Sequence, residues 1–145
     1  MIVLDASVFA KLFVSETDSE TAKALVQAIQ TSSVSVLLPS LFTYEIVQIG
    51  RYHGVEVDMV LNFLESQLVS NWNVIEPTRT HWGTAQAICE AGHTQSGFPA
   101  MYDAVYHALA IEGQGAFVTA DKKHYMKARQ FGAIHLLQDW ADALE

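Results

Sequence analysis

Four acidic residues stand where a carboxylate is unusual, and together they have the composition of a metal site. Asp5 and Asp121 each follow a short apolar run, and Glu45 and Asp103 lie within segments of helical pattern. Two like charges about 4 Å apart repel by roughly 4 kcal/mol at an effective dielectric constant of about 20. If the four converge, they must raise their own pKa values or bind a cation. Oxygen ligands without Cys or His partners are typical of Mg²⁺ or Mn²⁺ sites.

Three of these acids also have a purely structural explanation. Asp5 and Asp121 are well placed to cap the helices expected after them. Asp103 falls in the first turns of an expected helix, where a negative charge interacts favourably with the helix dipole. Capping and metal binding therefore both remain open for these positions.

Glu45 is harder to explain by local structure, because its helical neighbours Leu41, Phe42 and Ile49 are apolar. An unpaired charge on such a stripe is strongly disfavoured. A buried salt bridge is the structural alternative, yet no Lys or Arg occurs between Lys23 and Arg51.

The elements that must position these acids are short apolar strands alternating with helices. Strands are expected at residues 2–5, 34–38, 73–76, 116–119 and 134–137. Helices are expected at residues 7–14, within 15–30, and at 40–51, 57–69, 80–91, 101–112 and 121–131. This alternation predicts an α/β fold with a central parallel sheet of about four or five short strands and helices on both faces. Ligands of such sheets bind beyond the carboxyl ends of the strands, which is where Asp5 and Asp121 lie.

Length and composition limit the organisation of the chain. With 145 residues, half of them hydrophobic, residues 1–145 are expected to form a single domain. No apolar run is long enough to span a membrane, and no signal peptide is visible. Cys89 is the single cysteine, which fits a reducing cytoplasm.

The formal net charge of −8 excludes nucleic-acid binding by bulk electrostatics, because neutralising phosphates requires Lys and Arg. It leaves open a local, metal-assisted contact with nucleic acid, or a basic protein partner.

Four motifs carry a resemblance to a known family. The segments IVLDASVFAKLF, SLFTYEI, YDAVYHALA and FVTADKKHY, in this order and spacing, resemble the PIN-domain nucleases, and among them the VapC-type toxins. The resemblance runs from Met1 to about Leu137. It implies a single PIN-like domain in which four acids are the catalytic, metal-binding residues: Asp5, Glu45, Asp103 and Asp121. It also implies that the hydroxyls of Ser7 and Thr119 lie beside the metal, although ordinary capping explains them equally well.

The resemblance further implies a metal-dependent endoribonuclease, the toxin of a type II toxin–antitoxin pair, which hydrolyses RNA phosphodiester bonds with Mg²⁺ or Mn²⁺. A small antitoxin protein and a homodimer are the implied partners. Lys122 and Lys123 follow Asp121 and are candidates to bind substrate phosphates, and the rings of His124 and Tyr125 are candidates to stack on unpaired bases. A solvated helix face is the alternative for these four residues.

Two other functions compete with the nuclease. One is a non-catalytic PIN-like module that binds RNA or protein. The other is a phosphatase of the haloacid-dehalogenase type, which requires a second Asp at position 7, where this chain has Ser7. The segments at 40–51 and 57–69 carry more apolar residues than one amphipathic face needs, which also predicts a contact with another chain, with burial in the core as the alternative.

Overall fold

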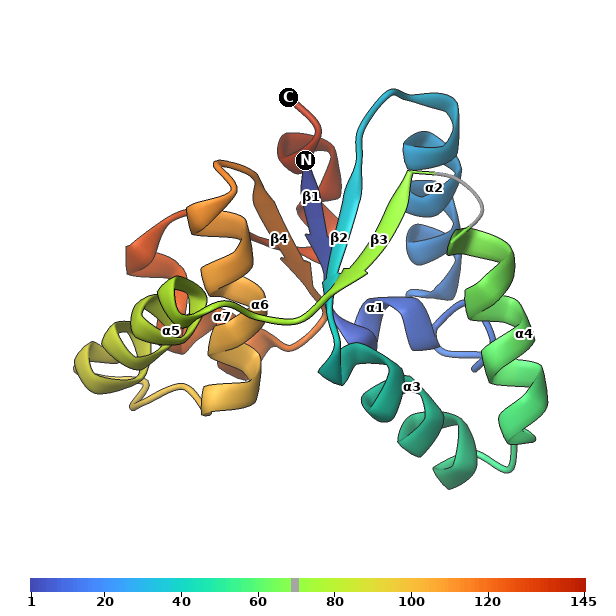
Figure 1. The fold of residues 1–145 in the computed structure, drawn as a ribbon, viewed down its shortest axis with the longest axis horizontal. Coiled ribbons are helices and arrows are strands. Elements are labelled where there is room, and N and C mark those ends of the chain that lie inside the picture. Colours follow the sequence, from blue (N-terminus) through green and yellow to red (C-terminus); the bar gives the residue numbers. More distant parts are fainter. Residues whose placement is uncertain (69–70) are drawn as a thin grey trace.

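The computed structural model describes residues 1–68 and 71–145, and within them five strands form one parallel sheet (Figure 1). The strands are β1 (Ile2–Leu4), β2 (Val36–Pro39), β3 (Trp72–Ile75), β4 (Ala116–Thr119) and β5 (Ile134–Leu136). Their order across the sheet is β3-β2-β1-β4-β5, and all four neighbouring pairs are parallel. The predicted parallel α/β fold is therefore confirmed.

The central strand explains why the sequence shows no alternation of apolar and polar residues. All three residues of β1 are fully buried, as are Phe117 and Val118 of β4, which pair with Val3 and Leu4. A strand covered on both faces has no solvent side to fill with polar groups.

Helices connect the strands and cover both faces of the sheet. They are α1 (Ala6–Ala10), α2 (Ser19–Thr31), α3 (Leu41–Tyr52), α4 (Val57–Leu68), α5 (Arg79–Ala91), α6 (Met101–Glu112) and α7 (Lys122–Ala128), with 3₁₀ segments η1 (Arg129–Phe131) and η2 (Leu137–Ala143). From β1 the chain steps outward to β2 and β3, and then crosses to β4 on the other side of β1. Right-handed crossovers put α1–α4 and α5–α7 on opposite faces. In the part of the chain that the structure describes, no helix has the length and apolarity needed to span a membrane.

The expected elements are observed with differences near their ends, and η2 follows the last strand where no element was expected. The first helix stops at Ala10, and residues 11–14 continue as hydrogen-bonded turns. The helix expected at 121–131 divides into α7 and η1, and Gly132 follows with a φ of 72°. The last strand stops at Leu136, because Leu137 begins η2. The helix expected at 57–69 is α4, and Val69 lies outside the described residues.

Gly50 allows α3 and α4 to approach closely. A Cβ built on Gly50 would lie 2.6 Å from Cγ2 of Val60, a buried and β-branched side chain with little freedom to move. We expect Gly50→Ala to lower the free energy of unfolding by about 1–3 kcal/mol through overpacking, measured by urea denaturation.

Gly83→Ala is the matched control for this substitution. Gly83 lies in α5, is exposed, and has no atom within 4 Å of the position that a Cβ would take. Alanine should therefore stabilise the protein by about 0.5–1 kcal/mol, as in an unobstructed helix. Equal effects at Gly50 and Gly83 would contradict the close approach of α3 and α4.

Candidate active site

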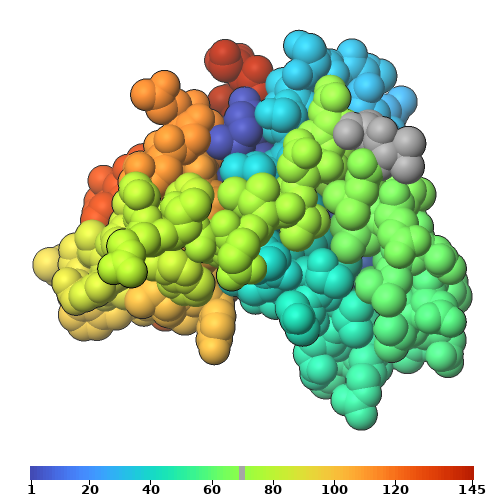
Figure 2. All heavy atoms as spheres, viewed as in Figure 1, coloured from blue at the N-terminus to red at the C-terminus, as the bar shows by residue number. Residues whose placement is uncertain are grey.

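The four predicted acids line one cavity of about 400 Å³ at the carboxyl edge of the sheet. Asp5 follows β1, Asp121 follows β4, Glu45 lies on α3 and Asp103 lies on α6. The other residues of the lining are Ala6, Ser7, Tyr44, Gln48 and Ile49. In the space-filling view, a notch separates the yellow and orange part of the surface, which includes α6, from the teal part, which includes α3 (Figure 2). The fold thus brings together four side chains that are far apart in the sequence.

Asp5 is both a helix cap and a member of this cavity, so capping does not exclude it from a candidate metal site. Its carboxylate accepts a hydrogen bond from the backbone N–H of Ser7 at 3.1 Å, which caps α1, and another from the hydroxyl of Thr119. Burial raises the pKa of Asp5, and the nearby charge of Asp103 raises it further, against the lowering effect of these hydrogen bonds.

Glu45 is paired with a phenol, so the salt bridge considered for it is wrong. The hydroxyl of Tyr106, on α6, donates to Oε2 of Glu45, and none of the ion pairs found among the described residues includes this carboxylate. Burial raises the pKa of Glu45 to about 7, with Asp5 and Asp103 adding to the shift and the phenol opposing it. Burial also raises the pKa of Tyr106, which keeps the phenol a hydrogen-bond donor.

Asp103 and Asp121 face each other from two elements. Asp103 lies in the first turn of α6. Burial is the main cause of its raised pKa, and the charge of Asp121 raises the pKa further. Asp121 is the N-cap of α7 and accepts from the backbone N–H groups of Lys123 at 2.7 Å and His124 at 3.0 Å. Capping therefore accounts for Asp121 without removing it from the cavity.

The donor set fits a hard divalent cation, although the arrangement is open. Every ionisable side chain in the lining is a carboxylate, apart from the phenol of Tyr44, and three of the four carboxyl pKa values are raised because the groups are buried close to one another. Carboxylate oxygens suit Mg²⁺ or Mn²⁺. Within residues 1–68 and 71–145, no three His, Cys, Asp or Glu side chains lie close enough together to hold an ion as they stand. Instead, Asp5 accepts a hydrogen bond from Thr119, and Glu45 accepts one from Tyr106.

The two predicted hydroxyl residues connect the acids. Thr119 is fully buried, donates to Asp5, and accepts from the backbone N–H of Asp121 at 2.9 Å. Ser7 lines the cavity, and its Oγ accepts from the backbone N–H of Ala120 at 3.3 Å. These contacts fix the end of β1 against the end of β4.

The two lysines that follow Asp121 are exposed, whereas the aromatic rings beside them are buried or half-buried, which the sequence did not predict. Lys122 lines a neighbouring cavity, and Lys123 is exposed. The proposed stacking of His124 on a base is wrong, because its side chain is only 2% exposed. The ring packs against Phe117 at 5.8 Å between centroids, and Nδ1 lies 3.8 Å from Oδ2 of Asp103. Tyr125 is half-buried and packs against the core.

Tyr106 is the site residue that the sequence analysis missed. It follows Asp103 by three positions, so both belong to one helical face, and this spacing in YDAVY was an available signal. Its apolar surroundings and stacking on Phe117 made it indistinguishable from a core tyrosine until Glu45 was placed opposite.

Behind Asp103, the fully buried His107 makes folding sensitive to acid. Its Nε2 bonds the carbonyl oxygen of Gly132, and its ring lies against His124 and Phe117. Burial lowers the pKa of His107 from 6.5 to about 4, which the bond to Gly132 opposes and the charge of His124 reinforces. Between pH 6.5 and about pH 4, His107 is protonated in the unfolded chain and neutral in the folded protein. Stability from the neutral ring is thus complete above pH 6.5 and is lost toward pH 4.

We therefore expect the difference in unfolding free energy between the wild type and His107→Gln to shrink by at most ~3 kcal/mol as the pH falls through this window. Urea denaturation at several pH values measures it. Asp5, Glu45 and Asp103 titrate in both proteins, so their contributions cancel in the difference, whereas His124 interacts with His107 and its coupling belongs to the measured effect. Parallel pH profiles for the two proteins would contradict a neutral, buried His107.

Solved structures of similar fold include a toxin, a toxin–antitoxin complex and a third protein, FitAcB. VapC20 of Mycobacterium tuberculosis, a toxin that cleaves the sarcin-ricin loop, has a TM-score of 0.62 at 16% identity, over 79% of this chain and 84% of that one. A toxin–antitoxin complex from Klebsiella pneumoniae has a TM-score of 0.67 at 13% identity, over 94% and 98%. FitAcB from Neisseria gonorrhoeae has a TM-score of 0.62 at 16% identity, over 95% and 99%. At these identities the likeness concerns the fold.

The sequence itself gives the family. No curated protein matches this chain. The family model of the PIN domain matches residues 2–130, which include Asp5, Glu45, Asp103 and Asp121. This match favours the PIN resemblance over the haloacid-dehalogenase alternative. The chain belongs to the PIN domain family.

Proposed function

We propose that this protein is an endoribonuclease that depends on Mg²⁺ or Mn²⁺ and hydrolyses RNA phosphodiester bonds. The observation that carries this proposal is the convergence of four carboxylates from two strand ends and two helices on one open cavity. Local capping explains Asp5 and Asp121 one at a time, but it does not explain why Glu45 and Asp103 face the same space.

Asp5 and Asp103 would be the principal ligands of the cation, with Asp121 and Glu45 completing the site. A bound divalent cation would polarise the phosphoryl oxygen and lower the pKa of a coordinated water. The protein's own part is to hold the carboxylates: Thr119 and Ser7 orient Asp5, and Tyr106 orients Glu45. Burial raises the pKa values of Asp5 and Glu45, so a bound cation would stabilise the charged forms of both carboxylates.

RNA is the substrate class that we propose, held by local contacts rather than by the overall charge of −8. Lys122 and Lys123 directly follow Asp121 and supply positive charge at the edge of the site. The relative that cleaves the sarcin-ricin loop supports RNA over other phosphodiesters.

We further propose that the protein is the toxin of a type II toxin–antitoxin pair, acts in the cytoplasm, and forms a homodimer. The similarity to a toxin–antitoxin complex over nearly the whole of both chains supports an antitoxin partner. Exposed apolar side chains on α3 and α4 offer contact surface: Tyr44, Tyr52, Val57 and Met59. Phe42 and Ile46, by contrast, belong to the core, so only part of α3 is available to another chain.

A metal-dependence assay tests the proposal. The purified protein is incubated with bulk RNA, and separately with a phosphomonoester, with and without Mg²⁺. A nuclease cleaves the RNA internally only with metal and leaves the monoester intact. RNA that is bound but not cut would instead indicate the non-catalytic PIN-like module.

A further inference from the structure

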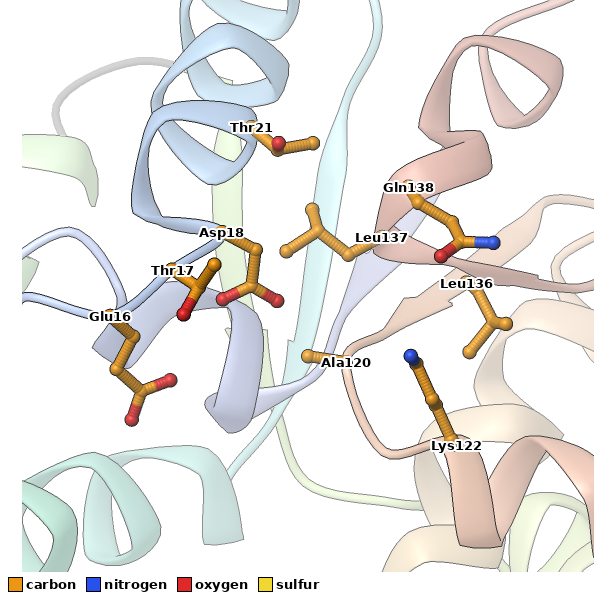
Figure 3. A pocket seen from close by; sticks show the side chains of 9 residues that line it. All are labelled: Glu16, Thr17, Asp18, Thr21, Ala120, Lys122, Leu136, Leu137 and Gln138. Carbon is orange, nitrogen blue, oxygen red and sulfur yellow. The ribbon is translucent and has the colours of Figure 1, made fainter.

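A second cavity, of about 530 Å³, lies beside the carboxylate cavity and has no part in the metal chemistry. Its lining comes from the segment before α2 and α2 itself, from the β4–α7 connection and the start of α7, and from the end of β5 and the start of η2: Glu16, Thr17, Asp18, Thr21, Ala120, Lys122, Leu136, Leu137 and Gln138. Figure 3 shows the side chains of Asp18, Leu137 and Lys122 directed toward a common space, with Glu16 at its margin. The volume is typical of a small-molecule site.

The two cavities adjoin along the chain between β4 and α7. Ala120 lines the second cavity, and the next residue, Asp121, lines the carboxylate cavity. Ser7 lines the carboxylate cavity and accepts the hydrogen bond from the backbone N–H of Ala120. A nucleotide next to a phosphate held at the carboxylates would therefore be within reach of the second cavity.

A buried lysine fixes the acidic wall of the second cavity in place. The side chain of Lys11 is only 9% exposed, and its Nζ lies 2.7 Å from Oδ1 of Asp18 and also contacts Glu16. Ser19 braces the same segment, because its Oγ accepts from the backbone N–H of Glu16 at 2.9 Å and donates to the carbonyl of Val14 at 3.1 Å. The position of Asp18 is thus set before any ligand arrives.

The chemistry of the lining suits a nucleobase better than a phosphate. Leu136, Leu137 and Ala120 offer an apolar surface for the faces of a ring, and Thr21 and Gln138 offer hydrogen-bonding groups for its edge. Lys11 is already paired with Asp18 and Glu16 and so is not available to a phosphate, whereas a carboxylate oxygen accepts a hydrogen bond from an exocyclic amino group. Lys122, which also lines the cavity, can pair with the phosphate that the base carries.

We propose that this cavity is a base-recognition subsite, which takes an unpaired nucleobase bearing an exocyclic amino group (guanine, adenine or cytosine) next to the cleaved phosphodiester. The inference rests on the proposed nuclease function and adds to it the determinant of cleavage-site choice. Uracil has no exocyclic amino group and carries two carbonyl oxygens beside its single ring N–H donor, so it pairs less well with the carboxylate of Asp18.

The first test is the pattern of cleavage on a short RNA library with random sequence, read by sequencing the ends. Thr21→Val and Gln138→Leu remove hydrogen-bonding groups at nearly constant volume without touching the carboxylate cavity. We expect the wild type to favour one position occupied by amino-bearing bases, and each variant to weaken that preference roughly fivefold, as expected for one hydrogen bond. Thr31→Val, on the same helix about 15 Å away, is the matched control and should leave the pattern unchanged.

The second test needs no catalysis. Nucleoside 5′-monophosphates are titrated into the metal-free protein and followed by NMR of the backbone amides. GMP, AMP or CMP should shift the amides of Thr21 and Gln138, UMP should bind at least roughly fivefold more weakly, and Thr21→Val should reduce the shifts. A protein that binds these nucleotides but does not cut RNA would overturn the proposed function and keep the subsite. A protein that cuts RNA with an unchanged pattern in both variants, or with no amide response, would overturn the subsite.

Discussion

Asp5→Asn and Asp103→Asn are each expected to reduce RNA cleavage by ~100-fold or more while leaving the fold intact. Asparagine keeps the shape of the side chain and removes the charge that a divalent cation requires. Even residues that only support a metal ligand cost about 10–100-fold in affinity or activity when replaced, so a ligand should cost at least the upper end of this range. Initial rates on a defined RNA in Mg²⁺ measure the effect.

The fold of these variants is checked separately from their activity. Because burial and the neighbouring acids raise the pKa values of Asp5 and Asp103, neutral asparagine should leave the metal-free free energy of unfolding unchanged or higher. Asp142→Asn, an exposed position in η2 outside both cavities, is the matched control and should cleave at the wild-type rate. If Asp5→Asn or Asp103→Asn cleaved RNA at the wild-type rate, that residue would not be a ligand of the catalytic cation.

Chelation should abolish cleavage, and Mg²⁺ or Mn²⁺ should restore it. The acids of the site repel one another and have no Lys or Arg among the residues that line their cavity, so the cation is the charge that brings them together. Ca²⁺ prefers longer bonds and more ligands, and we expect it to bind without restoring activity. Gel assays on one RNA after EDTA treatment and dialysis give the comparison. Cleavage that persists after thorough chelation would exclude the metal mechanism.

The sequence predicted the parallel sheet and the approach of the acids for a physical reason. Buried parallel strands are short and continuously apolar, so residues 2–4 and 116–119 could be recognised, and the carboxyl ends of such strands meet at one edge. This reasoning places Asp5 beside Asp121 without knowledge of the strand order. Glu45 could be found because a charge on an apolar helical stripe requires a partner.

What the sequence did not predict depends on contacts between distant segments. Tyr106 and Glu45 are 61 positions apart, and only the packing of α6 against the sheet brings the phenol to the carboxylate. His124 lies among lysines in the sequence, yet the return of α7 onto β4 buries it. The second cavity is made by three separate segments, at residues 16–21, 120–122 and 136–138, and only the middle one belongs to a motif.

Mn²⁺ binding and RNA cleavage, measured on the same samples, decide whether the four carboxylates hold the cation that cuts the RNA. If they do, cleavage should rise in proportion to bound Mn²⁺, counted by electron paramagnetic resonance, and Asp103→Asn should lose binding and cleavage together. Undiminished Mn²⁺ binding by Asp103→Asn, or cleavage by wild-type protein that holds no Mn²⁺ or other divalent cation, would contradict this role of the carboxylates.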